Sequence, residues 1–364
     1  MTTWSGPLTT EPHHPELDLD AWVGQRTATY RFDNVDIVTG YREQIYPRSD
    51  VVPTLSHDSG RIIKRTLTNL WFDAATTAAL NTISARIEVF MILVGVSFPL
   101  GQYLFNDQTR ARYTSGVISS NSAYDNGFIV DQPLEHGFPI QGLDAIGPRL
   151  ADVLIRELLT GLPIEYTLEP TFYQSAGSWM AGTSRGYAVE QLSVDGDWLS
   201  PWFDNTNVMR FIRSFDPATA VPTFDFDSGN KVMRDPPPIE TDDLLGAANR
   251  FVVVSNGSTV TTGPVVGTYD VPSSAPHSIA NRGFVIPKVI DRQVEDVGQA
   301  QAIAANLGQR QTIFERVELT TAPDPRHDSY DVILWQGEKW LETAWSLPLV
   351  EGGKMRHTAR KTYS

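Results

Sequence analysis

Apolar and polar residues alternate with a period of two over much of residues 21–143. In "TATYRFDNVDIV" the apolar Tyr30 and Phe32 alternate with the polar Thr29 and Arg31, so one face of this segment is expected to be buried and the other exposed to solvent. Further segments of this kind follow at short intervals, separated by Gly, Asn, Asp and Pro. Short strands with turn residues between them are typical of a β-barrel or a β-sandwich.

The pattern becomes helical near residue 144. In "LDAIGPRLADVLIRELLTGLP" Pro148 suits the first turn of a helix, and Gly161 with Pro163 ends it. The apolar residues at helical spacing are Ile146, Leu150, Val153, Leu154 and Leu158. A second helix is predicted around "RGYAVEQL". A small α/β region is therefore predicted over residues 144–222.

A third helix is predicted in "NTNVMRFIRSF", where Asn205 or Thr206 would be the N-cap. Its apolar stripe would consist of Val208, Phe211, Ile212 and Phe215. Residues 223–248 are acidic and contain three consecutive prolines, so they are interpreted as an exposed, stiff connection.

The β-type pattern returns over residues 249–364, in segments such as "RFVVVSN", "YDVILW" and "KWLETAWSL". One helix interrupts it, with Asp296 as the N-cap and Gly308 as the end. The predicted buried face of this helix consists of Ala300, Ile303, Ala304 and Leu307. Residues 1–20 are rich in Pro, Thr and His without periodicity, which indicates an extended arm.

Composition narrows the possible functions. A length of 364 residues suggests two to three domains, and 41% hydrophobic with 20% charged residues is typical of a folded chain. The net charge of −14 argues against a protein that binds DNA by neutralising its phosphates. With 0 cysteines there can be no disulfide, thiolate nucleophile or cysteine-ligated zinc.

No targeting or membrane segment is expected. The N-terminus has no positively charged region followed by an apolar core, so it does not resemble a signal peptide. The strongly apolar run "VFMILVGVSFPL" is shorter than the roughly 18 residues that a transmembrane helix needs. We therefore expect a soluble protein without a membrane anchor.

Short motifs suggest chemistry only weakly. "SVDGDW" at 193–198 resembles the Asp-box of sialidases, but it occurs once and is interpreted as a turn at a helix end. "DFDSGN" at 225–230 resembles a calcium loop, yet Pro236 stands where the bidentate Glu belongs. "HHPE" at 13–16 could bind a metal opportunistically, and "NGS" at 256–258 matters only in a secretory pathway.

The acidic and aromatic residues offer further candidates. Glu190 paired with Asp197 or Asp204 would suit glycoside hydrolysis, but no motif supports either pair. Two aromatic groups could bind sugar, although their interpretation as core anchors is favoured. They are Trp198, Trp202 and Phe203, and Trp335, Trp340 and Trp345.

The most polar cluster lies in "TTAPDPRHDSYDVILWQGE", where Asp324 and Asp328 flank His327 and where Asp331 and Glu338 follow. Prolines bound this loop between two predicted strands, and no second set of metal ligands is visible nearby. His327 is therefore interpreted as a solvated rim residue. The sequence predicts no catalytic, cofactor-binding or metal-binding residue.

The order "NRFVVVSNGS … GTYDVPSSAPHS … NRGF … VEDVGQAQAIAANLGQR … FERVELTTAPDPRHDSYDVILW" resembles the C-terminal β-domain of bacteriophage tail hub proteins. These are the baseplate hub or hub-like minor tail proteins of long-tailed phages, here of the actinobacteriophage type. "TYRFDNVDIVTG", "GRIIKRTLTNL" and "FPLGQYLFN" resemble the first β-domain, and "EQLSVDGDWLSPWFDNTNVMRFIRSFDP" resembles the insert. The resemblance extends from about residue 22 to residue 363.

This resemblance implies a mainly β fold, with two tail-tube-like β-barrel domains at 21–143 and 249–364 that flank the α/β insert. It implies a homotrimer that joins the six-fold tail tube and distal tail ring protein to the three-fold tail tip and fibre proteins. The lumen would carry the tape-measure protein and then DNA, without specific binding. The protein would be assembled in the host bacterial cytoplasm and reside in the virion.

The resemblance implies no enzymatic activity, because the long C-terminal extension of some hubs is missing. The first alternative is a tail-associated tip protein that binds or hydrolyses cell-wall glycans. The second is the distal tail ring protein, normally a hexamer with one tube-like domain; two β-rich regions in one chain favour the hub.

Overall fold

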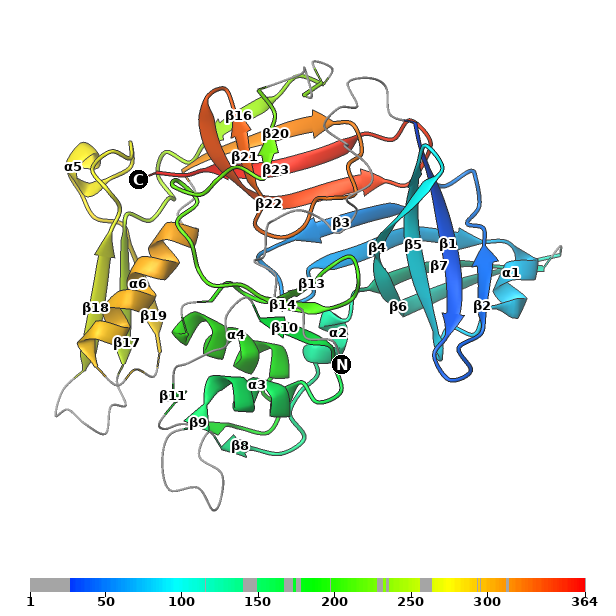
Figure 1. Cartoon of the computed structure of the whole chain (residues 1–364), viewed down its shortest axis with the longest axis horizontal. Helices are drawn as coiled ribbons and strands as arrows, with labels where there is room; N and C mark the ends of the chain where they lie inside the picture. The colour runs from blue at the N-terminus through cyan, green and yellow to red at the C-terminus, as the bar shows by residue number, and fades with distance from the viewer. Residues whose placement is uncertain are drawn as a thin grey trace.

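The structure is a computed structural model of the whole chain (Figure 1). It describes residues 27–114, 116–139, 149–166, 173–174, 178–196, 198–227, 232–233, 236–255, 264–292, 294, 296–311 and 314–363. Strands dominate these residues, which confirms the mainly β fold class. None of the described helices is long and apolar enough to cross a membrane. The predicted N-terminal arm and the "HHPE" and "NGS" motifs lie outside the described residues.

One large sheet dominates the structure and runs across most of the molecule in Figure 1. Its strands follow in the order β16 (Ile239–Asp242), β20 (Glu315–Thr321), β23 (Met355–Lys361), β22 (Glu338–Pro348), β3 (Thr54–Asp58), β4 (Arg65–Phe72), β7 (Gly116–Tyr124), β6 (Val96–Tyr113), β5 (Ala85–Leu93), β1 (Ala28–Asp36) and β2 (Arg42–Ile45). β21 (Val332–Trp335) pairs with β22, and β15 (Phe224–Asp225) pairs with β21. Among the described strands no pairing closes this sheet into a barrel.

The expected alternation is strictest in β5, where buried and half-buried residues alternate along the whole strand. Ile87, Val89 and Met91 face a core that no water reaches, while Arg86 and Glu88 point to the other face. Burying each large apolar side chain stabilises the fold by roughly 1.5–3 kcal/mol. Short helix α1 (Ala74–Ala79), capped by Asp73, connects β4 to β5.

The two β-rich regions predicted from sequence share a sheet and a core. β3 pairs with β22 in antiparallel register, with Leu55 opposite Leu347. The same hydrophobic cluster contains Leu67 from the N-terminal region and Met355 from the C-terminal region. The first and last thirds of the chain are therefore joined by backbone hydrogen bonds as well as by side-chain packing.

The α/β region lies below the large sheet in Figure 1. Its elements are α2 (Gly127–Val130), β8 (Phe138–Pro139), β9 (Arg149–Leu150), α3 (Ala151–Leu158), β10 (Ile164–Tyr166), β11 (Tyr173–Gln174), β12 (Ser178–Trp179), α4 (Arg185–Asp195), β13 (Trp202–Phe203) and β14 (Met209–Phe211). The helix predicted near residue 150 is present as α3, although Pro148 lies outside the described residues. The helix predicted around "RGYAVEQL" is confirmed as α4, whose N-cap is Ser184.

The helix predicted over "NTNVMRFIRSF" is wrong. Asp204 accepts hydrogen bonds from the backbone N–H groups of Thr206 and Val208, at 2.8 and 2.9 Å, and forms a tight turn. β14 then follows, parallel to β10 and antiparallel to β13. Met209 and Phe211 are buried on either side of the half-buried Arg210, which is the alternation of a strand. The same segment also has apolar residues at helical spacing, so its pattern fits both structures.

A separate three-stranded sheet carries the long C-terminal helix. It consists of β18 (Val265–Asp270), β17 (Arg250–Ser255) and β19 (Pro287–Asp291), with α5 (Ile279–Arg282) between β18 and β19. Helix α6 (Val297–Gln311) packs on this sheet through the predicted face, which is fully buried. The face consists of Ala300, Ile303, Ala304 and Leu307.

The start of α6 is confirmed and its predicted end is wrong. Asp296 accepts a hydrogen bond from the Gln299 N–H at 2.8 Å, as an N-cap does. The helix continues through Gly308 to Gln311. A Cβ at Gly308 would lie 2.1 Å from the ring of Tyr269, so this glycine permits close packing of α6 on β18.

The segment predicted as an exposed connection is partly buried. Phe224 and Phe226 belong to a hydrophobic cluster together with Trp335 and Trp340. Strands β15 and β16 both pair with strands of the large sheet. The acidic composition of the segment suggested an exposed position, but its aromatic residues supply enough apolar surface for packing. This segment therefore contributes to the C-terminal β region.

Candidate functional site

A buried cluster of two histidines and a glutamate lies where the 322–331 loop meets the large sheet. His327 Nδ1 is 3.0 Å from Glu342 Oε2, and His357 Nδ1 is 2.6 Å from Glu342 Oε1. All three side chains are at most 1% exposed. The interpretation of His327 as a solvated rim residue is therefore wrong.

The further candidate ligands that seemed to be missing come from β22 and β23, the second and third strands after the loop. His357 faces inward on β23, between the buried Met355 and Ala359. Glu342 faces the same side because β22 has a bulge between Glu342 and Ala344, which shifts the register of this strand by one residue. Bulges of this kind redirect a side chain that would otherwise point to the other face.

The other acidic residues singled out in the sequence lie around this cluster or away from it. Asp331 Oδ2 is 3.5 Å from His327 Nδ1 and accepts a hydrogen bond from the Asp328 N–H at 2.8 Å. Asp324 pairs with Arg326 at 2.8 Å. Glu338 does not join the cluster, because it lies at the start of β22, 3.5 Å from Lys361.

Aromatic rings enclose the cluster. Phe224 stacks on His327 with ring centroids 3.8 Å apart, and Phe226 lies edge-on to His357 at 5.6 Å. The two imidazole rings are 4.5 Å apart. These apolar walls remove the cluster from water, so each ionic interaction in it is stronger than at the surface.

Burial and charge pull the pKa values of the cluster in opposite directions. Burial lowers the pKa of His327, but the neighbouring Glu342 and Asp331 overcome this effect and raise it to about 10. Burial raises the pKa of Glu342, but the two histidines overcome it and lower it to about 2. Burial lowers the pKa of His357. The His327–Glu342 pair is therefore charged at neutral pH.

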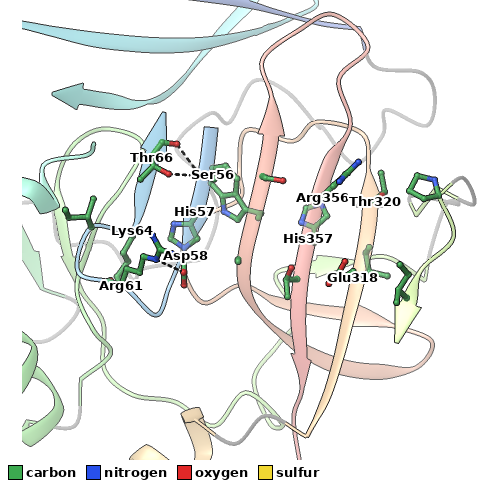
Figure 2. A pocket seen from close by; sticks show the side chains of 18 of the residues that line it. Ser56, His57, Asp58, Arg61, Lys64, Thr66, Glu318, Thr320, Arg356 and His357 are labelled. Atoms are coloured by element: carbon green, nitrogen blue, oxygen red, sulfur yellow. Dashed lines mark hydrogen bonds and ion pairs between the residues drawn. The ribbon is translucent and has the colours of Figure 1, made fainter. Parts of the chain in front are cut away.

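A polar groove of about 560 Å³ adjoins the cluster and includes His357 in its wall. Figure 2 shows side chains from β3, β20 and β23 around it, with Ser56, Glu318 and Thr320 among them. Its other polar lining residues are His57, Asp58, Arg61, Lys64, Thr66, Ser346, Arg356 and Thr358. Acidic and basic groups are mixed along the groove, and apolar residues such as Ile239 and Trp345 complete its lining.

Arg65 connects the loop to the rest of the molecule. Its guanidinium is 1% exposed and lies 2.6 Å from Asp328 Oδ1. It also donates a hydrogen bond to Asn205 Oδ1 in the α/β region and lies over the ring of Trp345, 5.7 Å from its centroid. Burial raises the pKa of Asp328 to about 6, against the effect of Arg65. The loop, the sheet and the α/β region thus share one buried charge network.

The other sequence motifs do not contribute to this site. "SVDGDW" contains the C-terminal end of α4 and its C-cap Gly196, as predicted, while Asp197 lies outside the described residues. Asp227 of the calcium-like segment accepts hydrogen bonds from the Gln336 and Gly337 N–H groups, whereas residues 228–230 lie outside the described part of the chain. Asp204 pairs with Arg210.

The two aromatic groups are core anchors, as the favoured interpretation predicted. Every one of these rings is at most 6% exposed, which leaves no flat apolar face for a sugar. They are Trp198, Trp202, Phe203, Trp335, Trp340 and Trp345.

The architecture is a large mainly antiparallel sheet with an α/β region and a small helix-covered sheet, and this is the fold of prophage tail proteins. The 43 kDa tail protein of prophage MuSo2 from Shewanella oneidensis superimposes with a TM-score of 0.60 and 11% identity, covering 91% of this chain and 98% of that one. The tail protein from Neisseria meningitidis MC58 gives 0.58 and 10%, covering 92% and 97%. Prophage tail protein gp18 from Listeria monocytogenes EGD-e gives 0.52 and 7%, covering 92% and 95%.

No protein-family model matches the sequence, and no curated protein matches it either. The likeness to phage tail proteins is therefore one of fold, over nearly the full length of both chains. It agrees with the resemblance to tail hub proteins noted from the sequence.

Proposed function

We propose that this protein is a structural component of a phage-type tail, at the hub between the tail tube and the tail tip. The observation that carries the proposal is the match of fold over more than nine-tenths of three tail proteins. The match extends over nearly the full length of both chains, which supports a similar order of domains in this protein. The sequence identities to two of these proteins are only 11% and 10%, so the partners and the assembly of this chain are part of the proposal.

The finer model is a homotrimer in which each chain contributes two tube-like β-barrel domains, 21–143 and 249–364. Three chains would then supply six modules to a ring that matches the six-fold tail tube. The continuous sheet supports this model, because the β3–β22 pairing holds the N-terminal and C-terminal β regions of one chain side by side. The insert 144–222 and the connection 223–248 would lie outside the ring.

The outward face of the sheet suits a channel wall. Along β3, β4, β7, β22 and β23 this face carries many small hydroxyl side chains beside the charged Asp58 and Arg356, and the apolar core residues lie on the opposite face. The hydroxyl residues are Thr54, Ser56, Thr66, Thr68, Ser120, Ser122, Ser346 and Thr358. Neutral hydroxyls hold phosphates less tightly than Lys or Arg, so tape-measure protein and DNA would pass without specific binding.

A structural role in the virion needs no catalytic residue, and we propose that the chain is not an enzyme. The competing proposal of a glycan-binding or glycan-hydrolysing tip protein rested on the aromatic groups and the excess of acid. The aromatic groups are buried. The partners proposed are the distal tail ring protein, the tape-measure protein and the tail tip or fibre proteins.

Two measurements test the proposal. Cryo-electron microscopy of intact tails, with this chain labelled by a fused tag, is expected to place three copies in a ring at the distal end of the tube. Light scattering of the purified chain is expected to give three times its 40.4 kDa mass if the trimer forms alone. A label along the tube or at the fibre ends, or six copies per tail, would refute the hub assignment.

A further inference from the structure

We propose that His327, Glu342 and His357 form a buried binding site for a divalent transition-metal ion such as Zn²⁺. The three side chains come from three separate segments, the 322–331 loop, β22 and β23, and all are buried. One ligand atom from each lies within 4.8 Å of the other two. Two imidazole nitrogens and a carboxylate are a ligand set that Zn²⁺ commonly takes in proteins.

The hydrogen bonds around His357 indicate which ring nitrogen faces the site. His357 Nε2 is 2.7 Å from Thr321 Oγ1, and Thr321 donates its own hydroxyl proton to the Ala322 carbonyl at 2.9 Å. In the His357 tautomer that carries its proton on Nε2, the Thr321 oxygen accepts a hydrogen bond from that Nε2–H. Metal-bound histidines are oriented in this way, by a hydrogen bond from the nitrogen that does not bind the metal.

That arrangement leaves a lone pair on His357 Nδ1, 2.6 Å from Glu342 Oε1. Two lone pairs at this distance repel each other unless a positive charge lies between them. A proton can occupy this position, and so can a metal ion. The 3.0 Å contact between His327 Nδ1 and Glu342 Oε2 presents the same choice on the other carboxylate oxygen.

The size of the site suits a metal ion after a small expansion. Zn²⁺ bonds to nitrogen and oxygen are about 2.0–2.2 Å long, so tetrahedral ligand atoms are about 3.3 Å apart. The separations of 3.0 and 2.6 Å are therefore about 0.3 and about 0.7 Å too short, as expected when protons join the groups and no ion separates them. Asp331 Oδ2, 3.5 Å from His327 Nδ1, offers a fourth ligand atom and balances the charge of the ion.

A further feature of the fold favours a built site. The β22 bulge turns Glu342 toward His327 and His357, so that three side chains from separate segments meet in one buried cluster. An ion bound here would cross-link the 322–331 loop to β22 and β23, and through Arg65 to the α/β region.

The test is isothermal titration calorimetry of the full chain with Zn²⁺ after chelator treatment. One equivalent is expected to bind, with release of protons and with affinity that increases with pH. Glu342→Gln is expected to weaken this binding about 100-fold or more, and Thr321→Val about 10-fold. Saturating Zn²⁺ is expected to raise the melting temperature by about 5 °C, and chelator to reverse the shift.

The matched control is His13→Ala combined with His14→Ala, because the "HHPE" sequence is another place where Zn²⁺ could bind. This variant is expected to keep the one tight equivalent. Tight binding that is lost in the control, or that survives Glu342→Gln, would overturn the proposal. Absence of binding by the wild-type chain would overturn it as well.

If the Glu342→Gln variant does not fold, Co²⁺ binding to the wild-type chain tests whether the metal site exists. Co²⁺ in a site with two imidazoles and a carboxylate is expected to give visible absorption bands that Zn²⁺ abolishes by competition. The arm variant is expected to give the same bands. A spectrum no different from Co²⁺ in buffer would refute the site. None of these results depends on whether the chain is a tail hub.

Discussion

Trp345 stacks on His57 across the junction between β22 and β3, with ring centroids 5.4 Å apart and an interplanar angle of 22°. The two residues are directly opposite each other in the antiparallel register. Arg65 lies near the same indole, so the ring contacts two residues of the N-terminal β region. This contact joins segments almost 290 residues apart in the sequence, and it lies at the seam between the two β regions.

The first prediction concerns this seam. Trp345→Ala is expected to lower the free energy of unfolding by about 3–5 kcal/mol, because a buried indole is replaced by a cavity. Chemical denaturation followed by circular dichroism measures the change. Tyr46→Ala is the control, because that ring is 68% exposed and its loss is expected to cost at most about 0.5 kcal/mol. A loss below about 1 kcal/mol for Trp345→Ala would mean that the seam contributes little.

Helix α6 provides the second prediction. Leu307→Ala is expected to destabilise the protein by about 2–5 kcal/mol, since Leu307 is 4% exposed in the core between α6 and its sheet. Val297→Ala, at a position 59% exposed on the same helix, is the matched control and should have little effect. Reversible thermal melts of both variants give the comparison. Equal losses in the two variants would show that the helix face has been assigned wrongly.

Local patterns in the sequence predicted the elements whose identity depends on local forces. The N-cap at Asp296 and the apolar face of α6 are examples, because a cap and a helical stripe are complete within a few residues. The "NTNVMRFIRSF" segment has a comparable stripe, but its pairing with β10 comes from a strand about 45 residues earlier. Tertiary pairing decided between two structures that the local pattern allowed equally.

The buried cluster was missed for the same reason. His327 stands among acidic residues and prolines, which is typical of a surface loop. Its partners Glu342 and His357 follow 15 and 30 residues later, and each looks like a polar residue on an alternating strand. One signal was available: in "KWLETAWSL" the glutamate breaks the alternation of apolar residues, which a bulge explains.

The third prediction is a pH dependence of stability that originates at His277. This ring is buried and stacks on Phe314 at 4.9 Å, and neither of its nitrogens has a hydrogen-bond partner among the residues that the structure describes. Burial lowers its pKa to about 4, with Arg282 adding to the effect and Glu315 opposing it. In the unfolded chain the pKa is about 6.5. The unfolded state therefore binds more protons between these values, and stability is lost as pH falls through this window.

His277→Phe removes the titrating group and keeps an aromatic ring in the stack. Between pH 7 and pH 5 the wild-type protein is expected to lose about 2 kcal/mol more stability than this variant. Denaturant titrations at the two pH values measure the difference. His136→Phe, at an exposed histidine, is expected to keep the wild-type dependence. Parallel pH profiles for wild type and His277→Phe would contradict the prediction.

The fourth prediction is that the purified chain hydrolyses neither peptidoglycan nor other cell-wall glycans. It follows from the proposed structural role and from the absence of a hydrolase motif in the sequence. Zymography against host cell walls is expected to show no clearing. Clearing that disappears when a single carboxylate is changed, for example in Glu190→Gln or Asp204→Asn, would establish an enzyme instead.

The last prediction concerns the net charge of −14. In a hub, DNA must leave through the lumen, and a basic wall would hold its phosphates through counterion release. An acidic or neutral wall repels the polyanion and keeps it centred, over a range of only about 8–10 Å at physiological salt. We therefore expect part of the acidic excess to line the channel. The competing location is the 223–248 segment, whose acids are Asp225, Asp227, Asp235, Glu240, Asp242 and Asp243.

The structure sharpens the choice, because Glu240, Asp242 and Asp243 are exposed at the outer edge of the large sheet, on β16 and after it. A structure of the assembled ring decides between the two locations. A net excess of Lys and Arg at the narrowest part of the channel would contradict the expectation that acidic residues line it. Given an acidic ring, changing two of its carboxylates to Lys should leave tails intact and slow genome release, because phosphates would then be held at the wall. Glu135→Lys with Glu157→Lys is the matched control: both side chains are exposed in the α/β region that is proposed to lie outside the ring, so the same change of charge there should leave the release rate unchanged.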